Sequence, residues 1–328
     1  MVLTAHLIGT LKDRVIAGGA IEYEEALALI EIEDVHLADE LLKAAHEITL
    51  AFHANRAGLC SLINAKSYLC GEDCGFCSQS VRYETSAARY ELLEPEIIIG
   101  AAKKAEQQGA QNFCIVTSGG SLSDDEFERI EAIVKQLGEE TDLGIDASLG
   151  FLTPERVRRL KEAGLRRFNS NLQTSREFYP TIVSTHSYDT RIETLEHLRD
   201  GGVEVCSGGI LGMGETREDR VKMAFELKRF APECLPVNIL NPRPGTPLEH
   251  APKLEPFEIL KTIAVYRFIL PRSNIKLAGG REVNLTKEEQ EKALKGGANG
   301  LILGGYLTTA GNPVTQDLNM LRRIGYEV

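Results

Sequence analysis

Several features are scarce or absent in this 328-residue sequence. Basic residues are outnumbered, with 37 Lys and Arg against 48 Asp and Glu, so the formal net charge is −11. Nucleic acids and anionic membranes attract a basic face, and we therefore expect neither as a partner. No apolar run approaches the ~20 residues of a membrane helix, and residues 1–10 lack the pattern of a signal peptide. We expect a cytoplasmic protein without a membrane segment.

Low-complexity tracts and linkers rich in Pro, Gly or Ser are also absent. Hydrophobic residues make up 43% of the chain and charged residues 26%, a balance typical of a folded protein with a sizeable core. The length suits one barrel domain better than two small domains.

The first 58 residues are predicted to be helical, because Leu37, Leu41, Ala45, Ile48 and Phe52 recur at helical spacing. After them, short apolar runs alternate with amphipathic segments. Capping boxes and first-turn prolines mark where these helices begin. The candidate strands are 61–67, 112–118, 144–149, 167–172, 203–211, 236–240, 275–278 and 300–304.

Eight strand–helix units in this length predict an α/β fold, a (β/α)8 TIM-type barrel. We expect an N-terminal helical extension over residues 1–58 and the barrel over residues 59–328. A doubly wound open sheet is the alternative. It is less favoured because no glycine-rich dinucleotide fingerprint follows the first strand.

The seven cysteines are odd in number and belong to a reducing compartment, so a disulfide framework is not expected. Residues 70–77 read CGEDCGFC, directly after the first predicted strand, where the catalytic loops of a barrel lie. Thiolates of Cys70, Cys74 and Cys77 can hold three irons of a 4Fe–4S cluster and leave the fourth open for a substrate. A zinc site is the alternative, but it requires a second Cys or His pair, which this spacing does not supply.

With Phe76 before its last cysteine, this loop resembles the radical S-adenosylmethionine (SAM) signature. Five segments are similar to those of biotin synthases and occur in the same order: SYLCGEDCGFCSQSVRY, FNSNLQTSREFYPTI, VCSGGILGMGET, LPVNILNPRPGTPL and KLAGGREV. The similarity extends from about residue 60 to the end of the sequence. The resemblance implies a cluster whose open iron chelates the amino and carboxylate groups of SAM. It also implies radical chemistry that inserts sulfur into dethiobiotin to make biotin.

The resemblance also assigns binding residues. Asn169, Asn171 and Gln173 alternate, so one strand would present them on the same side, where amides can donate to and accept from a ligand. The implied cofactor-binding residues are Phe76, Asn171, Gln173, Gly208 and Gly209, and the implied substrate-binding residues are Asn169, Asn171 and Asn238. The two glycines are expected to allow close approach of the backbone to the ligand.

In the family that the sequence resembles, the sulfur comes from an auxiliary cluster held by three cysteines and an arginine. Cys114 and Cys206 match two of the cysteines, Arg281 matches the arginine, and the third cysteine position falls on Asp146. Cys60 and Cys234 also stand at strand beginnings. We predict that the four strand cysteines, with Arg281 as a ligand or a neighbouring cation, line an auxiliary cluster. It would be 2Fe–2S or a larger four-iron cluster. The alternative is that these cysteines are small buried apolar residues.

The implied partners are dethiobiotin and an electron donor such as flavodoxin or ferredoxin, and the implied assembly is a homodimer. Three other functions remain open. The first is another radical SAM barrel enzyme, of the hydrogenase-maturation or methylornithine-synthase type. The second is a non-catalytic iron–sulfur carrier or scaffold. The third is a barrel hydrolase using His or Asp, for which the sequence has no H-x-x-x-H pair.

Overall fold

The chain forms a closed barrel of parallel strands, seen in a computed structural model that describes residues 3–328. The strands follow the order β5-β4-β3-β2-β1-β9-β8-β7-β6, and the barrel closes where Cys206 of β5 pairs with Cys234 of β7. Because β5 and β6 are two halves of one strand, the barrel has eight strand positions. The predicted (β/α)8 fold is confirmed.

The strands and helices have the following bounds. The strands are β1 (Gly58–Lys66), β2 (Asn112–Thr117), β3 (Gly144–Ser148), β4 (Arg167–Asn169), β5 (Glu204–Cys206), β6 (Gly209–Leu211), β7 (Cys234–Ile239), β8 (Asn274–Leu277) and β9 (Gly300–Ile302). The helices are α1 (Ala5–Ile16), α2 (Tyr23–Ile30), α3 (Val35–His53), α4 (Pro95–Gln107), α5 (Asp124–Glu140), α6 (Pro154–Glu162), the 3-10 turn η1 (Tyr179–Thr181), α7 (Tyr188–Asp200), α8 (Arg217–Lys228), α9 (Pro256–Ile269), α10 (Arg281–Asn284), α11 (Lys287–Leu294) and α12 (Val314–Arg323).

The segment 203–211, expected as one strand, is interrupted between β5 and β6. Pro236 of β7 lies beside the interruption and has no N–H to donate to a ladder. A Cβ on Gly208 would lie 2.0 Å from the Pro236 carbonyl oxygen, so only glycine fits here. Within the interruption, the Ser207 hydroxyl donates to the Ser170 carbonyl at 2.6 Å. The interruption therefore follows from one proline and one close backbone contact.

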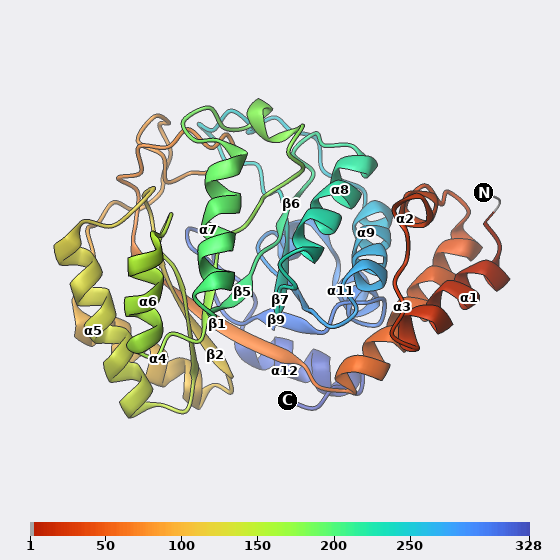
Figure 1. Cartoon of the computed structure of the whole chain (residues 1–328), viewed down its shortest axis with the longest axis horizontal. Helices are drawn as coiled ribbons and strands as arrows, with labels where there is room; N and C mark the ends of the chain where they lie inside the picture. Colours follow the sequence, from red (N-terminus) through yellow and green to blue (C-terminus); the bar gives the residue numbers. More distant parts are fainter. Residues whose placement is uncertain (1–2) are drawn as a thin grey trace.

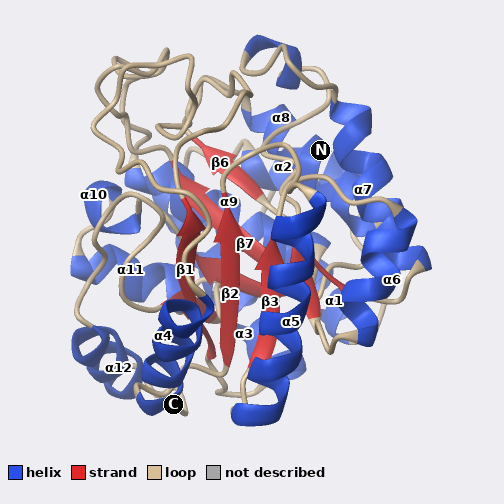
Figure 2. Cartoon of the chain, turned by 90° about the vertical axis from the view of Figure 1, so that its left-hand side faces the viewer, coloured by secondary structure: helices blue, strands red, loops and turns tan. Residues whose placement is uncertain are grey.

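The parallel strands end at one side of the barrel, where the functional loops gather. Figure 2 shows β1, β2 and β3 pointing toward the end of the barrel where long loops lie. The longest connection after a barrel strand runs between β1 and α4 and contains the cysteine loop. Loops at this end of a (β/α)8 barrel form the active site.

Three helices precede the barrel and lie at one side of it (Figure 1). Helix α3 packs on α1 and α9, and α2 packs on α8 and α9. We propose the domain division at residues 58 and 59, because α3 ends at His53 and β1 begins at Gly58. Across residues 3–328, none of the helices combines the length and apolar character that a membrane crossing requires.

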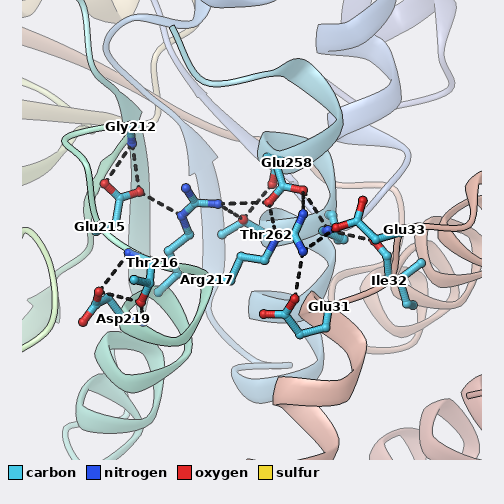
Figure 3. A network of polar contacts seen from close by, with 12 residues as sticks. Glu31, Ile32, Glu33, Gly212, Glu215, Thr216, Arg217, Asp219, Glu258 and Thr262 are labelled. Atoms are coloured by element: carbon cyan, nitrogen blue, oxygen red, sulfur yellow. Dashed lines mark hydrogen bonds and ion pairs between the residues drawn. The ribbon is translucent and has the colours of Figure 1, made fainter. Parts of the chain in front are cut away.

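A buried ion network joins these N-terminal helices to the barrel (Figure 3). The Glu258 carboxylate accepts from Arg217 at 2.7 and 2.9 Å and from Lys261 at 2.8 Å. Lys261 also donates to the Ile32 carbonyl at 2.8 Å, and Arg217 pairs with Glu31 at 2.8 Å. Burial tends to raise the pKa of Glu258, but these two cations outweigh it, and the folded-state pKa is lowered.

Replacing Glu258 by alanine is expected to destabilise the chain by about 3–5 kcal/mol, the usual cost of leaving a buried charge without its partner. The Lys261 side chain, only 1% exposed, would lose its carboxylate. The measurement is the free energy of unfolding in urea at pH 7. The Glu258 contribution is present above the unfolded pKa of glutamate and is lost as the pH falls through the lowered folded pKa.

The matched control is Glu31→Ala, which removes an exposed carboxylate from the same network. Its expected cost is below about 1 kcal/mol, as for other surface ion pairs. Equal losses for the two variants would contradict a buried anchoring role for Glu258.

Candidate functional site

A cavity of about 430 Å³ opens at the carboxyl ends of the strands and extends into the barrel. Most of the predicted site residues line it. They are Cys70, Cys74, Phe76 and Cys77 of the loop after β1, the amides Asn169, Asn171, Gln173 and Asn238, and the strand cysteines Cys60, Cys114, Cys206 and Cys234. Gly208, Gly209 and Arg281 are not among its lining residues.

The cysteine loop is held by backbone hydrogen bonds. The Cys77 N–H donates to the Cys74 carbonyl at 2.9 Å, and the Gly75 N–H donates to the Ile182 carbonyl at 2.8 Å. Tyr68 and Leu69 enter the loop with left-handed backbones, at φ 62° and 56°. This conformation is costly for residues with a Cβ, so the surrounding contacts must hold it.

The three loop thiols suit a cluster better than a single metal ion. Within residues 3–328, no three Cys, His, Asp or Glu side chains are placed to hold one metal ion. Each ligand of a four-iron cluster binds a different iron, so its thiolates stand farther apart than the ligands of one ion. Burial raises the pKa of Cys74 to about 12 and also raises that of Cys77. These thiols therefore need a bound cation to become thiolates, as iron–sulfur ligands do.

The amides line the cavity although β4 is shorter than predicted. The strand ends at Asn169, and Gln173 has a left-handed backbone at φ 74°. The Asn171 Oδ1 accepts from the Gly208 N–H at 3.1 Å, and Asn238 exchanges hydrogen bonds with the backbone of Gly209 and Gly279. The buried Oε1 of Gln173 has no partner among residues 3–328. An unpaired buried acceptor of this kind suits a ligand hydroxyl or N–H.

The four strand cysteines converge inside the barrel. Cys206 and Cys234 are register partners at the closing seam, and Cys114 is the register partner of Asp146. The Cys206 thiol, together with Lys276 and Arg167 nearby, lowers the pKa of Cys234, although burial acts in the opposite direction. Burial by contrast raises the pKa of Cys60 to about 12.

Two buried cations face these thiols. Lys276, 4% exposed, lines the cavity, and although burial tends to lower its pKa, the thiols and Asp146 raise it. Arg167 lies 3.5 Å from Asp146 and 2.8 Å from Glu204. Buried cations beside thiols favour the thiolate form and the binding of an anionic group. The strand cysteines thus lie in a pocket suited to a negatively charged cluster.

Comparison of the sequence with known proteins identifies the family of this chain. A family model for the radical SAM superfamily matches residues 66–227, and one for the biotin and thiamin synthesis associated domain matches residues 236–327. The chain is 44% identical to the biotin synthase of Acetivibrio thermocellus over 97% of this chain and 98% of the relative. It is 45% identical to the biotin synthase of Carboxydothermus hydrogenoformans, over 98% and 99% of the two chains.

The chain belongs to the biotin synthase family. It is a radical SAM enzyme, as predicted. Membership implies a 4Fe–4S cluster with SAM, and a further iron–sulfur cluster.

Solved structures of lower identity confirm the fold. A methylornithine synthase superimposes with a TM-score of 0.84 at 22% identity, over 97% of this chain and 96% of the other. A maturase of the FeFe-hydrogenase gives 0.84 at 18% identity, over 99% of this chain and 75% of the other. Both protein types were considered above as alternative functions. At 22% and 18% identity, the similarity shows only that they share the barrel fold.

Within this biotin synthase family member, Arg281 is buried beside the cavity and paired with other protein groups. Its guanidinium donates to Asp317 at 2.5 and 3.1 Å and to Gln290 at 2.6 Å. It also reaches the carbonyl of Ile302, the register partner of Cys60, at 3.5 Å, so its role as a ligand or neighbouring cation stays a prediction. The cations that influence the pKa of Cys234 are Lys276 and Arg167. Sequence reasoning missed both, although Lys276 stands two residues into the predicted strand 275–278, where a charge is unusual.

The predicted glycines lie against protein backbone. A Cβ on Gly209 would approach the Gln173 carbonyl oxygen to 2.4 Å, and one on Gly208 would approach Pro236. The two glycines thus allow close packing against β7 and against the segment after β4. Their approach to a ligand stays a prediction.

Three cavity residues close to the cysteine loop were also missed: Glu72, His186 and Arg191. Glu72 lies within the cysteine motif, His186 lies just before α7, and Arg191 lies in the first turn of α7. The sequence positions of His186 and Arg191 give no signal of proximity to the motif, because η1 and the loop after it bring them back to the cavity.

Proposed function

We propose that the chain converts dethiobiotin to biotin by inserting a sulfur atom taken from an auxiliary iron–sulfur cluster. The observation that carries the proposal is one cavity lined by two sets of thiols, one on the loop after β1 and one on the barrel strands. A pure electron carrier needs only one set of cluster ligands and no substrate cavity. The 41–46% identity to biotin synthases over nearly the whole chain supports the same reaction.

Cys70, Cys74 and Cys77 would hold the 4Fe–4S cluster, whose remaining iron binds SAM. Together with SAM and one electron from a reductant, this group would supply a carbon radical able to remove hydrogen from an unactivated carbon. Arg191, half-buried in the cavity, forms no ion pair with a carboxylate in the described part of the chain and so suits the carboxylate of SAM. Phe76 and the free acceptor of Gln173 line the same region of the cavity.

Dethiobiotin has a ureido ring and a carboxylate tail, and amides can both donate to and accept from such a ring. Asn169, Asn171 and Asn238 are proposed to bind it. The Asn169 Nδ2 donates to the Cys206 thiol at 3.3 Å, so this amide lies next to the strand cysteines. A substrate held there would lie close to the proposed sulfur source.

We propose that Cys60, Cys114, Cys206 and Cys234 hold a four-iron auxiliary cluster with an extra sulfide, in place of a 2Fe–2S cluster. Four convergent thiols support the larger cluster, because iron–sulfur clusters prefer thiolate to carboxylate. Asp146, at the usual cysteine position, lies opposite Arg167. The family resemblance further supports a flavodoxin or ferredoxin as electron donor, a homodimer and a cytoplasmic location.

The test is an anaerobic assay of the reconstituted chain with SAM, a low-potential reductant and dethiobiotin, followed by mass spectrometry. Biotin and 5′-deoxyadenosine are both expected, and neither when SAM is omitted. Formation of 5′-deoxyadenosine without biotin would indicate another radical SAM reaction. Absence of both products would indicate a carrier or scaffold.

A further inference from the structure

The acidic residues inside the cysteine motif bind a second loop, residues 182–186. Asp73 accepts from the backbone N–H groups of Ser184 at 2.9 Å and Thr185 at 3.1 Å, and from the Ser184 hydroxyl. Glu72 accepts from the Thr185 hydroxyl at 2.5 Å. The cysteine loop and the 182–186 loop are therefore fastened together by two carboxylates.

Glu72 also begins a chain of hydrogen bonds that ends at Arg191. The Glu72 Oε2 lies 2.7 Å from the His186 Nδ1, and the His186 Nε2 lies 3.2 Å from the Arg191 guanidinium. Arginine can only donate, so the His186 Nε2 must accept. The His186 proton then sits on Nδ1 and is donated to Glu72, which fixes the tautomer.

Other protein groups also hold the guanidinium of Arg191, and, within residues 3–328, one N–H on each of its two terminal nitrogens stays free. It donates to the Asn171 carbonyl at 3.0 Å and to the Tyr179 hydroxyl, and it lies near the rings of Phe151 and Tyr179. The Tyr179 hydroxyl is also 2.8 Å from the His186 Nε2. His186 is thus the link between Arg191 and the cysteine loop.

We propose that Glu72 and His186 are positioning residues that hold Arg191 in register with the cysteine loop. Arg191 would meet the carboxylate of SAM while the cluster held by that loop binds the same molecule. Two attachment points on one small cofactor must be correctly spaced, and misplacing one weakens binding. This inference rests on the proposed function, because it requires SAM as the ligand.

Two substitutions of similar size separate the two hydrogen bonds of His186. In His186→Asn the amide reaches the place of Nδ1, so the bond to Glu72 is kept and the bond to Arg191 is lost. In His186→Gln the amide reaches the place of Nε2, so the acceptor for Arg191 is kept. We expect His186→Asn to raise the Kd of SAM about tenfold or more, as for loss of a hydrogen bond to a charged group. We expect a similar rise in His186→Gln, because this variant keeps the bond to Arg191 but loses the bond that joins residue 186 to Glu72.

The Kd is measured by equilibrium dialysis of SAM with reconstituted protein, after the iron content of each variant is determined. A second readout is the change that SAM causes in the electron paramagnetic resonance (EPR) spectrum of the reduced cluster, which should weaken in His186→Asn. The KM for SAM should rise in this variant with kcat little changed. Glu72→Gln keeps an acceptor for His186 and should behave like the unchanged chain, whereas Glu72→Ala should behave like His186→Asn.

A Kd of SAM in either His186 variant within about threefold of that of the unchanged chain, at full iron content, would overturn the inference. Loss of iron in His186→Asn would also overturn it, because the role would then be support of the cluster loop. Failure of the unchanged chain to bind SAM would instead contradict the proposed function, so the two failures are distinguishable.

Discussion

Replacing Cys114 or Cys206 by alanine is expected to abolish biotin formation while SAM cleavage continues. Both thiols are buried in the barrel strands near Lys276, and neither belongs to the loop after β1. Even residues that only hydrogen-bond a metal ligand affect affinity by about 10–100-fold when removed, so loss of a ligand should lower biotin yield by more than about 100-fold. The loop that is proposed to bind SAM would be unchanged.

The measurement is the ratio of biotin to 5′-deoxyadenosine in anaerobic single-turnover reactions. The matched control is Cys234→Ser beside Cys234→Ala, since serine keeps the size but is a poor iron–sulfur ligand. Both are expected to lower the ratio if Cys234 is a ligand. Normal biotin yield in Cys114→Ala or Cys206→Ala would show that these thiols are buried apolar residues only.

Removing the Cys74 thiol should have a broader effect, the loss of both products. Cys74 lies between the other two loop cysteines and beside Arg191, and its side chain is buried. With two thiolates instead of three, the cluster with an open iron should not form, and 5′-deoxyadenosine formation should fall by more than about 100-fold. Without SAM cleavage no hydrogen is removed from dethiobiotin.

The variant Cys74→Ala is assayed for 5′-deoxyadenosine with dithionite as reductant, which removes any dependence on a protein donor. Its fold is checked by circular dichroism and by its remaining iron, which should be that of the strand cysteines. Substantial 5′-deoxyadenosine formation by a folded Cys74→Ala protein would contradict the assignment of the loop cysteines.

Much of the fold was predictable because it depends on local patterns. Capping boxes, which the sequence pattern indicates, form at Ser123 and Thr286, and Thr153 caps a helix that begins with Pro154. Alternating strands and helices fixed the barrel. The interruption of 203–211 was not predictable, because it depends on Pro236 lying beside Gly208 in the closed barrel.

The residues of the candidate site that belong to a sequence motif were predictable. Those that the fold brings together from distant parts of the sequence were not. The spacing of Cys70, Cys74 and Cys77 is a local signal. The neighbours of the strand thiols depend on register, which places Lys276 in the cavity and leaves Arg281 with Asp317. Buried charges that face one another across a barrel leave no mark in sequence spacing.

The most direct test of the account is the iron and acid-labile sulfide content of anaerobically reconstituted protein, compared between the unchanged chain and Cys70→Ala. Two four-iron clusters predict about eight irons per chain, of which about four remain in the variant. A total of about four irons, all lost on removal of Cys70, would contradict the presence of two clusters in one cavity.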